Sequence, residues 1–215
     1  MEDNKNKIKG FTLLELLIAV AIFTTMVVLV VGSFGFSAKY QRQVRSNRDI
    51  SQGVRFAVTE ISNQVNISYN GPVVNAQGSN IIFGGENVYN FAILNGPNSR
   101  RTVRNGTMGN VLMIRGGDDY CRYFRRLKDG DIYRVAMWIN TEKGCLGQWQ
   151  GPNYLTGGEL NVLELKFSGI TNIRSANRFP YVEIWIKAEN KDKDEFYIPM
   201  ESRTTATIRN YGREV

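Results

Sequence analysis

Histidine is absent from this chain of 215 residues. Histidine is the side chain that most often acts as a general base and as a metal ligand. Its absence excludes catalytic sites of the Ser-His-Asp and Cys-His types, and without it the two cysteines make a poor zinc site. We therefore expect a protein that is not an enzyme and that has no metal or cofactor. A signal-anchored exported enzyme is the least favoured alternative.

Cysteine is also scarce, with only Cys121 and Cys145, which stand 24 positions apart and form no CxxC motif. In an exported protein the simplest interpretation is one disulfide between them, and two free buried thiols are the alternative.

Phosphate-binding loops are not predicted either, because the stretches FGGEN, RGGDD and TGGEL are not followed by Lys-Ser or Lys-Thr.

Charged residues are almost missing from residues 11–34, where Glu15 is the single ionisable side chain. At about 1.5 Å per residue, a helix of this length crosses a bilayer core of roughly 30 Å. Lys5, Lys7 and Lys9 precede the apolar run. By the positive-inside rule they hold this end in the cytoplasm and place the rest of the chain outside. No small-residue cleavage site typical of a secretory signal peptide follows the run.

Glu15 needs a positive partner, because a carboxylate inside a membrane is costly and usually functional. If the chain is cut between Gly10 and Phe11, a new α-amino group appears four residues before Glu15. In a neighbouring subunit, shifted along a shared axis, that amine lies directly against the carboxylate. Two unit charges about 4 Å apart attract by roughly 4 kcal/mol at an effective dielectric constant of 20. This attraction is large enough to set the register between two helices.

The stretch KGFTLLELLIAVAIF resembles the leader and helix start of type IV pilins and type II secretion pseudopilins. The resemblance implies cleavage after Gly10 by a prepilin peptidase, N-methylation of Phe11, and pairing of Glu15 with the N-terminus of an adjacent subunit. It implies four kinds of partner: other pilin or pseudopilin subunits, the prepilin peptidase/methyltransferase, an inner-membrane assembly platform and membrane lipid. The expected location is the inner (cytoplasmic) membrane, with a single pass and the head outside the cytoplasm, and then a pilus or pseudopilus.

The remaining chain predicts an α+β fold. A polar segment after Phe34 carries a sparse apolar stripe at helical spacing: Val44, Ile50, Val54, Val58, Ile61 and Val65. We expect one helix over about residues 11–67, packed in its second half on a mainly antiparallel sheet, in the lollipop shape that the resemblance also implies. The expected domains are a leader at 1–10, a membrane or filament-core helix at 11–34, an amphipathic extension at 35–68 and a β-rich head at 69–215.

Alternating residues predict several strands in the head. A hairpin is expected with arms Cys121–Leu127 and Ile132–Ile139 around Asp129-Gly130. Residues 159–170 predict a strand with Leu163, Leu165 and Phe167 on one face. The segment YVEIWIKAE predicts another, with Val182, Ile184 and Ile186 on one face. Pro199 suggests that the last strand lies at an edge or has a bulge.

Two finer interpretations concern the role of the subunit. Three stretches loosely resemble PilW-like minor pilins and J-type minor pseudopilins: RQVRSNRDISQGVRFAVTEIS after the apolar run, DGDIYR in mid-chain and RTTATIRN near the end. The chain length also favours a minor subunit. We therefore expect a structural minor subunit that primes or tips the filament. Secretion pseudopili, adhesive or twitching pili and competence pili share the motif, so the machine stays open.

The alternative is a tip-located binding module, either a DNA-uptake receptor or an adhesin, on the same scaffold. Arginines interleaved with aromatic residues suggest an anion or DNA contact at Arg122, Arg125, Arg126 and Arg134. The competing interpretation is a hairpin whose alternate side chains face water while its rings pack on the sheet, and it makes nucleic acid the less favoured partner.

Overall fold

The computed structural model describes residues 12–68, 72–75, 77, 79–83, 86–99, 102–103, 106–145, 147–170, 172–173, 180–191 and 199–208. The chain divides into two compact units, Met1–Arg45 and Ser46–Val215. Helix α1 (Leu13–Asn66) begins in the first unit and ends in the second. Gly10 and Phe11, to which the sequence gives central roles, lie outside the described residues.

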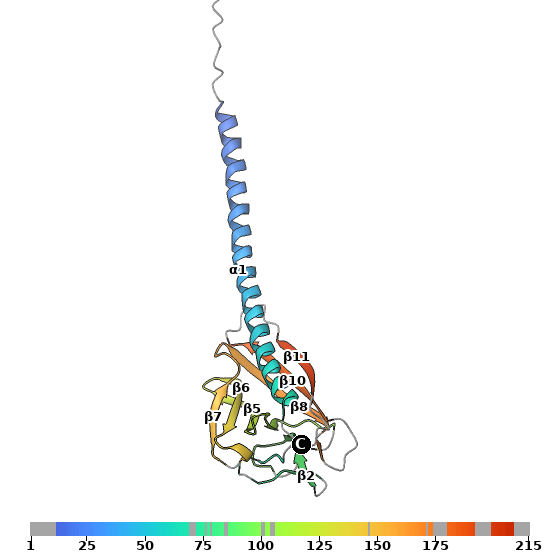
Figure 1. Cartoon of the computed structure of the whole chain (residues 1–215). Helices are drawn as coiled ribbons and strands as arrows, with labels where there is room; N and C mark the ends of the chain where they lie inside the picture. Colours follow the sequence, from blue (N-terminus) through green and yellow to red (C-terminus); the bar gives the residue numbers. More distant parts are fainter. Residues whose placement is uncertain are drawn as a thin grey trace, which may run out of the picture. The chain divides into compact units, whose positions relative to one another are not determined.

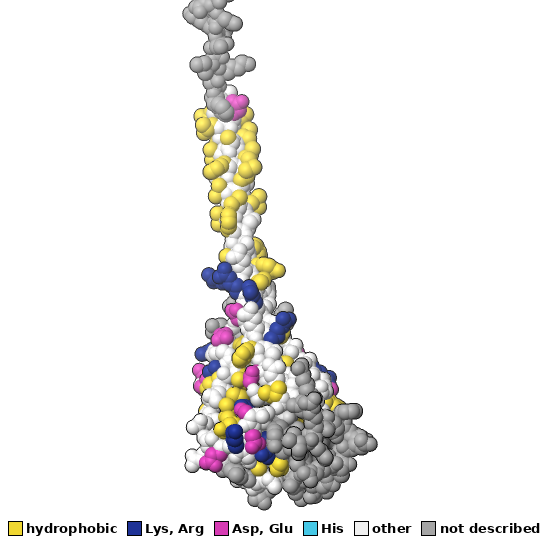
Figure 2. Space-filling view, viewed as in Figure 1, with side chains coloured by type: hydrophobic (Ala, Val, Ile, Leu, Met, Phe, Trp, Pro, Cys, Tyr) yellow, Lys and Arg dark blue, Asp and Glu magenta, His cyan; other side chains and the backbone are white. Residues whose placement is uncertain are grey.

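The first unit is an apolar helix whose side chains are exposed. Every residue from Thr12 to Arg42 is exposed, including large apolar ones such as Leu13, at 80%, and Phe34, at 72%. Figure 2 shows apolar side chains along the visible face of this part of α1. By length and composition α1 is the one helix among the described residues suited to cross a membrane, a test that a signal sequence also passes.

Hydroxyl groups within the apolar run bond to the helix's own backbone. Thr24 donates to the carbonyl of Val20 at 2.9 Å, and Ser33 donates to the carbonyl of Leu29 at 2.8 Å. Such back-bonding satisfies a hydroxyl that has no water beside it. These polar residues therefore do not conflict with a membrane location.

In the second unit, α1 buries the apolar stripe that its spacing predicts. The buried residues are Ile50, Val54, Ala57, Val58, Ile61 and Val65. The prediction is wrong for Val44, whose side chain is 47% exposed. Val44 belongs to the first unit, before the packed part of α1, since the second unit begins at Ser46. Gly53 also faces the head, since a Cβ there would overlap the Cδ1 of Leu160.

The strands that the structure describes in the second unit form two larger antiparallel sheets and one small sheet, and Figure 1 labels most of them. The five-stranded sheet has the order β3-β4-β5-β6-β7: β3 (Phe91–Leu94), β4 (Val111–Arg115), β5 (Cys121–Asp129), β6 (Ile132–Asn140) and β7 (Trp149–Tyr154). The three-stranded sheet has the order β11-β10-β8: β8 (Leu160–Ile170), β10 (Tyr181–Asn190) and β11 (Met200–Thr207). The small sheet contains β1 (Ile82–Phe83), β2 (Glu86–Tyr89) and β9 (Asn172–Ile173), and a short 3-10 helix, η1 (Lys143–Cys145), follows β6.

The five-stranded sheet buries apolar residues on both of its faces. One face joins the α1 stripe and the three-stranded sheet in a single core through Phe91, Ile93, Leu112, Ile114, Phe124 and Val135. The other face packs against Val73, Ile81 and Val88 through Ala92, Leu94, Val111, Met113, Tyr123 and Trp138. The α+β architecture predicted from the sequence, a long N-terminal helix packed on antiparallel sheets, is confirmed.

The predicted hairpin is confirmed as β5 and β6, with one shift. Asp129 pairs with Ile132, so the two loop residues are Gly130 and Asp131, one position later than predicted. Gly130 has φ of 60°, and glycine with positive φ at the first loop position is typical of a type II′ turn.

The prediction for β8 is wrong at Leu163. The pairing with β10 shifts between Lys187 and Ala188, where Lys187 faces Glu164 and Ala188 faces Val162. Leu163 is the extra residue of this β-bulge, which changes the face on which the following side chains lie. Val162, Leu165 and Phe167 are therefore buried, whereas Leu163 is half-buried.

Candidate functional site

The N-terminus of α1 is closed by a reciprocal pair of side chains, Thr12 and Glu15. The Thr12 amide and hydroxyl both donate to Glu15 Oε2 at 2.9 Å. In return, the Glu15 amide donates to Thr12 Oγ1 at 3.3 Å. This is a capping box, in which a threonine at the helix start and a glutamate three residues later satisfy amides that lack a partner within the helix.

The capping box was not part of the interpretation of Glu15 from the sequence, although the spacing Thr-x-x-Glu is its known signal. All the hydrogen bonds described for this carboxylate go to Oε2. Within the described residues Oε1 accepts none, so it is available to an ammonium group. Capping of its own helix by one oxygen is therefore compatible with contact between the other oxygen and a cation.

The arginines proposed for anion contact lie on opposite faces of the five-stranded sheet. Arg122 and Arg126 alternate with Phe124, on the face that packs toward α1. Arg125 lies on the other face, where its guanidinium stands 5.0 Å from the centre of the Trp138 ring. Arg134 also lies on that other face, in register with Leu127. The pleat of the strands separates residues that are adjacent in sequence, so the four arginines do not form one face.

Two of these arginines are engaged inside the head. The Arg122 guanidinium binds the Asp118 carboxylate with both terminal nitrogens. Arg134 donates to Asp129 at 2.9 Å and to the carbonyl of Thr156, and its guanidinium lies 4.0 Å from the centre of the Tyr154 ring. Their side chains are only 12% and 18% exposed. Both are poor candidates for phosphate contact.

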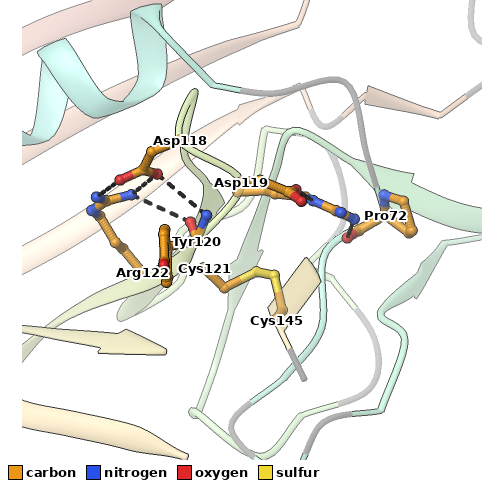
Figure 3. A network of polar contacts seen from close by, with 8 residues as sticks. Pro72, Asp118, Asp119, Tyr120, Cys121, Arg122 and Cys145 are labelled. Atoms are coloured by element: carbon orange, nitrogen blue, oxygen red, sulfur yellow. Dashed lines mark hydrogen bonds and ion pairs between the residues drawn. A yellow bond between two sulfur atoms is a disulfide. The ribbon is translucent and has the colours of Figure 1, made fainter. Parts of the chain in front are cut away.

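A polar network and the disulfide fix the turn between β4 and β5, as Figure 3 shows. Asp119 accepts from Arg115 Nε at 2.6 Å, and Arg115 also donates to the carbonyl of Pro72 at 3.0 Å. The Asp119 carbonyl accepts from the amide of Gly144 at 2.9 Å. Cys121 and Cys145 are joined by the disulfide, with their Cα atoms 5.1 Å apart. This network therefore connects three separate segments of the head.

The Asp118–Arg122 pair gives the stability of the head a pH dependence. The hydrogen bond from Arg122 lowers the pKa of the Asp118 carboxyl, so the unfolded chain binds its proton more tightly than the folded chain. The contribution of this ion pair to the unfolding free energy is complete above the ordinary aspartate pKa of about 4. It is lost as pH falls through the lowered pKa that Asp118 has in the folded chain. Asp118 is 48% exposed, so we expect Asp118→Asn to reduce the unfolding free energy at pH 7 by only about 0.5 kcal/mol.

Urea denaturation of the unchanged protein and of Asp118→Asn over a pH series measures the difference between their unfolding free energies. The exposed Asp131 of the hairpin turn provides the matched control, because Asp131→Asn removes the same charge. If the decrease in unfolding free energy caused by Asp118→Asn stayed constant down to the lowest pH, the ion-pair explanation would be contradicted. Such a result would indicate that the substitution changes the conformation of the turn.

Comparison with known protein families gives a match at the N-terminus. Residues 5–31 match the family model described as the prokaryotic N-terminal methylation motif. No curated protein and no solved structure matches the chain. The motif and the apolar helix fit membrane anchoring and pilus assembly, and they suggest a structural protein that interacts with other pilin subunits and a prepilin peptidase. The methylation motif, which includes Thr12 and Glu15, supports a type IV pilin-like protein.

Proposed function

We propose that this chain is the precursor of a minor subunit of a type IV pilus or secretion pseudopilus. A prepilin peptidase removes residues 1–10 by cutting after Gly10, and Phe11 is then N-methylated. Before assembly, the apolar helix crosses the inner membrane once, and the lysines before it keep the N-terminus in the cytoplasm. The subunit then enters the filament with other pilin subunits, where it primes assembly or occupies the tip.

The observation that carries this proposal is the arrangement at Glu15. One carboxylate oxygen caps α1, and the other accepts no hydrogen bond within the described residues. The α-amino group of a processed neighbouring subunit would supply the missing partner. This pairing would offset the cost of a carboxylate in an apolar environment, and it would set the axial position of one subunit relative to the next.

The exposed apolar surface of the first unit supports the same proposal. The large apolar side chains that the structure describes there are about half to four-fifths exposed, and their burial requires lipid or another apolar helix. A head with two larger sheets on a chain of 215 residues is large for a major subunit, which favours the minor role.

The alternative of a DNA-uptake receptor or adhesin receives less support. Its main candidates, Arg122, Arg125, Arg126 and Arg134, are divided between two faces of a sheet, and Arg122 and Arg134 bind acceptors within the head. No observation on the described residues favours this alternative over a structural subunit.

Processing provides the test of the proposal. We expect the chain, coexpressed with a prepilin peptidase and extracted from membranes, to begin at N-methylated Phe11 when its intact mass is measured. Gly10→Leu should block cleavage, because it places a bulky side chain at the scissile bond, whereas Lys9→Gln changes only a neighbouring charge and should still be processed. If mature material retained Met1 through Gly10, the pilin-type mechanism would lose its new amine and the proposal would fail.

A further inference from the structure

The head contains a groove of about 500 Å³ that the function proposed above does not use. Residues 163–166 of β8 form one side, and the loop between β3 and β4 contributes Asn95, Gly96 and Pro97. The remaining lining comes from the start of β4, from Arg125 and Arg126 of β5, and from Tyr133 of β6. All of these residues belong to the second unit.

Two arginines give the groove a fixed positive charge. Arg126 is held in place because its Nε donates to the carbonyl of Val162 at 2.6 Å and its guanidinium lies 3.6 Å from the centre of the Tyr133 ring. Arg125 rests on Trp138, and its Nε is buried without a hydrogen-bond partner. Within the described residues, no carboxylate forms an ion pair with either guanidinium.

The groove also contains one lysine, Lys166, and one glutamate, Glu164, whose charge acts on Arg126 as well. Lys166 forms an ion pair with Glu164 at 2.6 Å, and both line the groove. The net charge of the lining side chains is therefore positive and comes from Arg125 and Arg126. Fixed, incompletely paired guanidinium groups are well suited to carboxylates, to which they donate two parallel hydrogen bonds.

Apolar residues complete the lining. The bulge in β8 turns Leu163 out of the core, and this half-buried side chain lines the groove together with the half-buried Pro97. Bulges often redirect a side chain toward a binding site. The groove therefore offers an apolar contact beside two cations, which is the pattern that a peptide with both acidic and apolar side chains would match.

We infer that this groove is a docking site for an acidic, partly apolar segment of another protein. A second copy of this chain is a poor occupant, because its net charge of +7 opposes approach to a positive site. Nucleic acid is also a poor occupant, because binding of single strands relies on open aromatic surfaces. Tyr133, the aromatic residue that lines the groove, already has its ring face covered by Arg126. The inference does not depend on filament assembly.

Binding of a synthetic peptide tests this inference on the full chain in a zwitterionic detergent. The probe is a fluorescein-labelled pentapeptide of alternating glutamate and leucine, and fluorescence anisotropy measures its Kd. We expect Arg125→Gln combined with Arg126→Gln to weaken binding at least tenfold. The matched control is Arg48→Gln combined with Arg55→Gln, which removes the same charge from exposed positions on α1 and should change Kd less than twofold.

Three outcomes would overturn the inference. If both double variants weakened peptide binding equally, the attraction between peptide and protein would depend on net charge alone. A single-stranded oligonucleotide that binds more tightly than the peptide, and loses binding with Arg125 and Arg126, would show a nucleic-acid site. Leu163→Glu provides an independent check if the arginine variant fails to fold, because it places a repelling charge in the groove at a partly exposed position. Unchanged peptide affinity in this variant would exclude the groove as the site.

Discussion

Glu15→Gln is expected to abolish incorporation of the subunit into filaments while leaving the cap of α1 intact. The glutamine amide oxygen can accept the same hydrogen bonds from the Thr12 amide and hydroxyl, because glutamine also functions in capping boxes. What it lacks is the charge that attracts the neighbouring amine. A loss of about 4 kcal/mol corresponds to a decrease in docking affinity of roughly 1,000-fold. Quantitative mass spectrometry of sheared filaments and of membranes measures the assembled fraction.

Thr12→Val is the control that separates the two roles of the carboxylate. It removes the hydroxyl that donates to Glu15 Oε2 and accepts from the Glu15 amide, but it keeps the negative charge. Loss of a helix cap typically costs about 1 kcal/mol, so we expect assembly to fall only a fewfold. If Thr12→Val were as severe as Glu15→Gln, or if Glu15→Gln assembled normally, the carboxylate would act as a helix cap and not as a docking charge.

The fold was predictable where one periodic pattern extends over many residues. The stripe from Ile50 to Val65 identifies the packed face of α1, and alternation identifies β10, where Val182, Ile184 and Ile186 are all buried. The prediction failed at Leu163, because a bulge breaks the alternation and depends on pairing with Lys187 and Ala188 of β10, which lie 24 and 25 positions later in the chain. Local pattern contains no information about such a long-range register.

The candidate sites were predictable to a smaller extent. A cluster in sequence is not a cluster in space when it lies on a strand, since successive side chains point to opposite faces. Arg125 and Arg126 are adjacent in sequence, yet they rest on different rings, those of Trp138 and Tyr133. Both nevertheless line one groove, because the groove lies at the start of β4, where Arg125 pairs with Val111. One side of the groove is formed by β8, and the position of β8 cannot be inferred from the spacing of the arginines.

Removal of the disulfide is the second change expected to have a large effect. Cys121→Ala combined with Cys145→Ala should reduce the unfolding free energy of the head by about 3 kcal/mol, because the bond closes a loop of 24 positions in the unfolded chain. The expected decrease in Tm is roughly 6–12 °C. Urea denaturation of the full chain in detergent, monitored by tryptophan fluorescence, measures the change, since Trp149 packs against the apolar cluster that contains both cysteines.

Reduction of the unchanged protein should reproduce the effect of the double variant, because both treatments release the same loop. If the oxidised and reduced proteins unfolded at the same urea concentration, the network of Arg115, Asp119 and Pro72 would hold the turn without the bond. The disulfide lies in the second unit and Glu15 in the first, so the two defects should be independent. Glu15→Gln should leave head stability unchanged, and a cysteine variant should lose assembly only at temperatures where its head unfolds. An assembly defect in a folded cysteine variant would instead place the turn between β4 and β5 in a contact with another subunit.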